Sequence, residues 1–173
     1  GDNIINSRSN RPDRSPACTQ LVNQSITYSL MYFLMRLSAA EQKRILNFQN
    51  SNGDSFISFV IVHASPELLT LVVDMGGDMI DFVGKNSAKM PPLFLAVKVN
   101  KFPVVERVTA EDKSLLSQIY MEKIGDEYKR FDLLTFYIYQ IVNKAEYERG
   151  KVTILKNIDY LLEHIQVQDK GFL

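Results

Sequence analysis

Apolar side chains recur at spacings of three and four residues in several separate stretches of the chain. This periodicity predicts amphipathic helices, because it places the apolar residues on one helical face. The helices predicted from it cover residues 19–37, 39–48, 65–76, 114–124, 131–142 and 153–164, and a further helix begins at 100–103. In 131–142 the apolar residues surround the helix, so we expect this helix to be central.

Capping residues mark several of the predicted helix ends. Ser38 and Glu41 have the spacing of a capping box, in which each side chain bonds the backbone N–H of the other residue. Ser65, followed by Pro66 and an acidic residue, is typical of a helix start. Gly76 is expected to end that helix in the left-handed conformation, which a residue without a Cβ adopts readily. Residues 50–54 and 86–89 carry turn-forming side chains.

The segment 55–62 is short and β-branched, and by itself it looks like a strand. The helix start that follows favours a unit of turn, helix and helix instead. The same order recurs 36 residues later, from Ser55 to Pro91, where a turn precedes the apolar segment 91–97 and the helix that begins at 100–103. Two such units at this period predict an all-α fold built as a stacked array of repeats.

Residues 50–82 resemble the ankyrin repeat over one complete unit without a gap. Gly53 lies at the turn glycine, and residues 55–61 take the place of the T-P-L-H-L-A-A helix. Ala64 stands at the connecting glycine, and Gly76-Gly77-Asp78 matches the closing G-A-D. The unit from residue 86 matches best at 92–97, while 33–48 and 158–164 resemble second helices of eroded units. The Thr and His of the family box are missing, which removes hydrogen bonds that the family makes between turns.

The resemblance implies one ankyrin-like domain over residues 18–173, with about three to four units and irregular extra helices. Residues 1–17 are polar, contain three Arg and two Pro, and are expected to form a mobile arm. The domain is expected to be monomeric.

Composition and charge narrow the classes of function. Lys plus Arg and Asp plus Glu both number 20, so the chain has no cationic excess for nucleic acid. One cysteine and two histidines favour neither a disulfide nor a metal site, and we expect no cofactor. No catalytic motif is present, so a non-enzymatic protein is expected. The uncharged stretches are too polar for membrane insertion, and the lone cysteine fits a soluble protein of the cytoplasm.

The resemblance also implies where a partner would bind, because ankyrin repeats use their turn tips and the concave end of the first helix. These positions are Ser51, Asn52, Asp54, Val62, His63 and Phe82 in one unit, and Ser87, Ala88, Met90, Lys98 and Val99 in the next. The apolar members are expected to form an exposed patch between Asp54 and Lys98. The sequence therefore predicts a non-catalytic protein–protein interaction module or scaffold.

Two alternatives remain open. Degenerate ankyrin units with irregular helices are similar to those in effectors of intracellular bacteria, where they accompany catalytic domains. The chain would then be the targeting or regulatory part of a larger enzyme that is delivered into a host cell. In the second alternative, the aromatic segment 131–142 makes the chain a helical oligomerisation domain.

Overall fold

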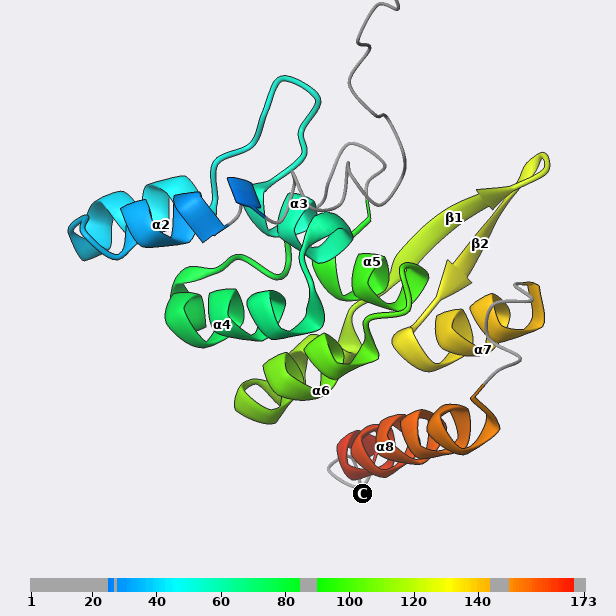
Figure 1. Ribbon diagram of the computed structural model, residues 1–173. Coiled ribbons are helices and arrows are strands. Elements are labelled where there is room, and N and C mark those ends of the chain that lie inside the picture. Colours follow the sequence, from blue (N-terminus) through cyan, green and yellow to red (C-terminus); the bar gives the residue numbers. More distant parts are fainter. Residues whose placement is uncertain (1–24, 27, 85–89, 144–149, 170–173) are drawn as a thin grey trace, which may run out of the picture.

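The computed structural model describes residues 25–26, 28–84, 90–143 and 150–169, and these are mostly helical (Figure 1). A helix covers residues 28–34, before the elements labelled in Figure 1. The helices labelled in Figure 1 are α2 (Ala39–Leu46), α3 (Phe56–His63), α4 (Pro66–Gly76), α5 (Pro92–Lys98), α6 (Phe102–Glu111), α7 (Leu133–Asn143) and α8 (Lys151–Asp169). Two short 3-10 helices, η1 (Gly77–Met79) and η2 (Lys113–Ser117), and two strands, β1 (Tyr120–Ile124) and β2 (Glu127–Phe131), complete the elements.

Serine caps determine where three of the helices begin. Ser38 and Glu41 form the predicted capping box at α2: the Ser38 N–H donates to Glu41 Oε2 at 3.0 Å, and the Glu41 N–H donates to Ser38 Oγ at 3.5 Å. Ser55 and Ser65 accept in the same way at the starts of α3 and α4. Because these caps satisfy N–H groups that have no partner within the helix, they fix the first residue of each helix.

The glycine pair after α4 differs from the prediction. Gly76 has φ −73° and is the last residue of the helix, whereas Gly77 has the positive φ of 47°. Gly76 is required for a different reason, because a Cβ there would overlap the side chain of Ile80. Gly76 therefore allows Ile80 to pack close to the backbone, and Gly77 supplies the positive φ that ends the helix.

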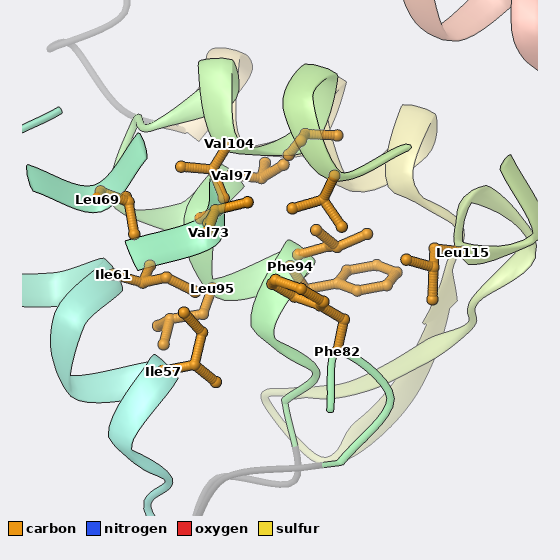
Figure 2. Packing of buried hydrophobic residues seen from close by; sticks show 14 of the residues in the cluster. Ile57, Ile61, Leu69, Val73, Phe82, Phe94, Leu95, Val97, Val104 and Leu115 are labelled. Atoms are coloured by element: carbon orange, nitrogen blue, oxygen red, sulfur yellow. The ribbon is translucent and has the colours of Figure 1, made fainter. Parts of the chain in front are cut away.

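Alternate helices along the chain form two rows. Figure 1 shows α3, α5 and α7 following one another in one row, with α4, α6 and α8 below them. The side chains between the rows are buried and form one hydrophobic cluster. Figure 2 shows Ile57 and Ile61 of α3 beside Leu95 of α5, with Leu69 and Val73 of α4 above them. α2 packs against α3 and α4 at one end of the two rows.

Hydrogen bonds from two side chains, Asn47 and Lys101, join segments that lie more than thirty residues apart in the sequence. The Asn47 amide at the end of α2 donates to the Met79 carbonyl at 2.6 Å, and its oxygen accepts from the Asp81 N–H at 2.7 Å. Lys101, between α5 and α6, donates to carbonyls at the end of α3. Asn100 positions Lys101 for these bonds, because its left-handed φ of 58° ends α5 in a Schellman motif. In this motif the Lys101 N–H donates to the Ala96 carbonyl.

The prediction of a helix over 114–124 is wrong. Residues 113–117 form η2, and residues 120–131 form an antiparallel hairpin in which Tyr120 pairs with Phe131 and Ile124 with Glu127. Gly125 has φ 62° at the first central position of the two-residue turn, as a type II′ turn requires. The hairpin extends beyond α7 in Figure 1. The described residues are thus mainly helical with one small sheet, which agrees with the helical class predicted from the sequence.

The helices predicted over 131–142 and 153–164 are present as α7 and α8. Phe136 and Tyr137 of α7 are buried, in agreement with the central position expected of this helix. Buried polar contacts join α8 to its neighbours: the Asn157 amide donates to the Tyr137 hydroxyl at 2.9 Å, and the Tyr160 and Thr109 hydroxyls are 2.8 Å apart. These bonds satisfy polar groups within the cluster and fix the rotation of α8. The predicted arm over 1–17 lies outside the described residues.

Candidate functional site

A groove of about 810 Å³ runs along the exposed side of α3. We call it the α3 groove. Its walls come from the end of α2 and the turn that follows, its floor from α3, and one edge from α5. The lining residues are Arg44, Ile45, Phe48, Asn50, Asp54, Ser55, Phe56, Ser58, Phe59, Val62, His63 and Leu95. Its volume falls within the range of about 300–1,000 Å³ that is usual for binding sites.

The floor is apolar because α3 is apolar on both sides. Its sequence, FISFVIVH, has one strongly polar side chain, and Ile57, Val60 and Ile61 fill the core. Phe59 and Val62 lie on the other side of the helix, where Val62 is 42% exposed. An amphipathic helix would carry polar residues at these positions. The exposed side of α3 is thus as apolar as a surface that packs against another element.

The α2 wall adds a large exposed aromatic ring. Phe48 follows α2 and is 66% exposed, while Ile45 is half-buried beside it. Arg44 projects from the same end of α2 and is exposed. Its guanidinium makes no ion pair within 4.0 Å among the described residues. This wall therefore combines an apolar surface with one positive charge.

The opposite wall is a turn that its own hydrogen bonds hold in place. Asn50 Oδ1 accepts from the N–H groups of Asn52 and Asp54, each at 2.9 Å, and Gly53 has φ 84°. Gln49 and Ser55 pair through their backbones in an isolated antiparallel β-bridge. These bonds place Asp54 beside the beginning of α3, so the groove has a carboxylate at one end.

His63 closes the other end of the groove. Its ring lies against Phe59, with the ring centroids 4.6 Å apart. Burial lowers the pKa of His63 below its usual value, and the charge of Lys101 lowers that pKa further. The imidazole is therefore mostly neutral at pH 7, and it presents an aromatic face together with a hydrogen-bonding edge.

Lys101 anchors the end of α3 from below. Its ammonium donates to the carbonyls of Ile61 and Ala64, both at 2.6 Å, and to that of Val62 at 3.3 Å. Carbonyls in the last turn of a helix have no partner within the helix, and a positive charge there interacts favourably with the helix dipole. Lys101 thus positions both Val62 and His63 in the groove.

Three of the predicted site residues meet in the α3 groove: Asp54, Val62 and His63. Ser51 and Asn52 are exposed at the tip of the turn that forms its wall. Lys98 and Val99 are half-buried at the end of α5, and they do not line the groove. Ser87 and Ala88 lie outside the described residues.

Phe82 and Met90 require a correction, since both were expected on an exposed patch. Phe82 is 6% exposed and Met90 is 1% exposed, so neither reaches the surface. Figure 2 shows Phe82 close to Phe94 and Leu115. Burial of apolar area is favourable, and these side chains fill the core where the chain passes from η1 to α5.

Two aromatic residues that line the groove, Phe48 and Phe59, were not among the predicted site residues. Arg44 and Phe56 were not considered as site residues. A signal was present, because 55–62 carries apolar residues on every side and one helix packed on a core needs them on one side only.

A second hollow, of similar volume, lies between the end of α4, η1 and α6. Arg107 crosses it, with its guanidinium 2.7 Å from both Asp74 and Glu111. These side chains are well exposed, so the ion pairs contribute little to stability. The lining also includes Lys43 and the carboxylates of Asp78, Asp81 and Asp112, so acidic side chains outnumber basic ones in this hollow.

Comparisons with known proteins identify no family for the chain. No protein-family model matches it, and no curated protein matches its sequence. In the part of the chain that the structure describes, no helix is both long enough and apolar enough to cross a membrane. Within the same residues, no three His, Cys, Asp or Glu side chains are grouped as metal ligands would be. What the chain binds therefore has to be inferred from the geometry of the α3 groove.

Proposed function

We propose that the chain is an ankyrin-like protein-interaction module that binds a segment of another protein in the α3 groove. One observation carries the proposal: a walled groove contains an apolar floor and the exposed ring of Phe48. Scattered exposed apolar residues are common on soluble proteins, but a concave group of aromatic side chains is typical of interaction sites.

Features of the sequence and fold support the repeat interpretation. Residues 50–82 match the ankyrin unit. The helix pair α3–α4 packs against the following pair α5–α6, with α3 against α5 and α4 against α6. The bonds from Asn47 to Met79 and Asp81 span 32 and 34 residues, close to the ankyrin period of 33. In such an array, the first helices of successive units lie side by side and form one continuous surface. The α3 groove lies on the surface that α3 contributes.

The oligomerisation alternative receives less support. The aromatic side chains of the segment 131–142 that were expected at an interface include Phe131, Phe136 and Tyr137, and all three are buried within the chain. They are therefore already packed against α5, β1 and α8.

Site-specific photocrosslinking tests the proposal. Val62 in the groove and Val142 on α7 are both exposed valines, so each can be replaced by benzoylphenylalanine with little effect on folding. In lysate, the probe at position 62 should form an adduct with a discrete protein, and the probe at 142 should not.

A competing substitution makes the result specific to the groove. Phe48→Asp should abolish the adduct at position 62, and thermal unfolding should show that the variant remains folded. Identical adducts at the two probe positions, or adducts that persist in Phe48→Asp, would refute the assignment of the groove.

A further inference from the structure

The α3 groove lies along the exposed side of α3, which belongs to the row formed by α3, α5 and α7. α5 packs against α3 on one side and against α7 on the other, so α5 has a helical neighbour on each side (Figure 1). The floor of the groove is formed by Phe59, Val62 and His63 of α3, and Leu95 of α5 lies at one edge. The established contacts of this row are helix against helix, and the exposed side of α3 continues that surface.

We propose that the partner segment is an amphipathic helix with an acidic side chain, which lies along α3 and places its carboxylate at Arg44. This inference rests on the proposed function and specifies the occupant of the same groove. It follows from the backbone groups at the site, the length of α3 and the charge on the α2 wall.

The backbone around the groove has few groups to offer an extended peptide. At the start of α3, the Phe56 N–H donates to the Phe48 carbonyl at 3.2 Å, and the N–H groups of Ser58 and Phe59 donate to Ser55. In the turn, the Asn50 N–H donates to the Asp54 carbonyl at 3.0 Å, and the Gly53 N–H donates to the Asn50 carbonyl at 2.9 Å. A peptide bound as a strand depends on main-chain hydrogen bonds, whereas a helix satisfies its own backbone and needs only side-chain contacts. A groove lined by side chains therefore fits a helix better.

The length of α3 sets the size of the contact. Eight residues at a rise of about 1.5 Å per residue span about 12 Å, or slightly more than two helical turns. A partner helix beside it would contact Phe59, Val62 and the Phe48 wall through about three apolar anchors. Those anchors should occur at positions i, i+3 or i+4, and i+7, which lie on one helical face.

Arg44 determines the sign of the polar contact on the α2 wall, while the carboxylate of Asp54 lies on the other wall at the beginning of α3. The guanidinium is exposed on the α2 wall, with no ion-pair partner among the described residues. His63 at the far end is largely neutral, so it does not select for charge in the same way. A carboxylate on the partner helix can accept two parallel hydrogen bonds from a guanidinium, which gives the contact geometric specificity.

Selection from a displayed library of random 16-residue peptides tests this inference on the full chain. The selected peptides should repeat the predicted apolar spacing and carry Asp or Glu on one flank. Circular dichroism and NMR shifts should show that they are helical when bound. Phe48→Asp should weaken their binding at least tenfold, as measured by fluorescence anisotropy.

Charge reversal isolates the contribution of Arg44. Arg44→Glu should raise Kd about tenfold, and replacing the acidic residue of the peptide by Lys should restore affinity for that variant. Lys123→Glu on the hairpin reverses a matched exposed charge away from the groove and should leave Kd unchanged. An unchanged Kd in Arg44→Glu overturns the acidic contact.

The outcomes separate the two proposals. If the selected peptides depend on Phe48 but bind in an extended form, the helical partner is wrong and the interaction groove stands. If none of them depends on Phe48, both proposals fail. Helical peptides that depend on Phe48 and Arg44 establish the inference.

Discussion

Replacing Lys101 with methionine should destabilise the end of α3 that carries Val62 and His63. The substitution keeps an unbranched apolar side chain but removes the ammonium that donates to three carbonyls. Two of these carbonyls belong to the buried residues Ile61 and Ala64. They would lose their donor where water has little access.

The magnitude follows from those two carbonyls. A buried polar group without a partner costs about 1–3 kcal/mol, so two of them would cost several kcal/mol. Val62 is partly exposed, and water can replace the ammonium at its carbonyl. Removing Lys101 also removes the unfavourable burial of its charge, which is why the pKa of this lysine is lowered. Because this gain offsets part of the cost, we expect a net loss at the lower end of the summed range, about 2–3 kcal/mol.

Urea unfolding followed by far-ultraviolet circular dichroism measures this loss. With a slope of about 2–3 kcal/mol per molar urea, the midpoint should fall by about 1 M. Lys43→Met, at an exposed position of α2, is the matched control and should change stability by less than about 0.5 kcal/mol. Equal midpoints for the two variants would show that water replaces the ammonium, and the proposed anchoring of α3 would then be wrong.

Two further predictions concern glycine packing and titration. Gly76→Ala should cost about 1–3 kcal/mol, because its Cβ would overlap Ile80, and an unchanged melting temperature would contradict this clash. For His63, burial and the charge of Lys101 lower the folded-state pKa below the unfolded value near 6.5, so the unfolded chain binds the proton first as pH falls. Urea midpoints of the wild-type chain should therefore fall more than those of His63→Gln between pH 7.5 and 5, and equal declines would refute this reasoning.

Local signals in the sequence predicted the helical part of the fold well. The capping serines of α2, α3 and α4 each bond a nearby N–H, so their effect depends on a few adjacent residues. The hairpin was missed because Leu115, Leu116 and Ile119 have helical spacing. Gly125-Asp126 was interpreted as a helix end, although the same two residues also suit a hairpin turn. Pairing between strands decided the outcome, and a single stretch of sequence does not display that pairing.

The candidate site was predicted in part for a similar reason. Asp54, Val62 and His63 were selected from turn and helix positions, and they line one groove. Which side of α3 stays uncovered depends on where α2 and α5 lie, and this depends on tertiary packing. The local sequence therefore does not distinguish Phe48 and Phe59, which line the groove, from Phe82 and Met90, which are buried in the core.

The arrangement of α5 has a consequence for the way the molecule opens. With seven residues, α5 is the shortest of the α-helices from α2 to α8, and a free helix of that length is unstable in water. Six of its residues are nevertheless buried, and it contacts α3, α6 and α7. α2 and α8 lie at the two ends and can separate in partial unfolding while the centre persists. The amide protons of α5 should therefore exchange with solvent only when the whole domain unfolds, so the shortest helix reports the global stability of the protein.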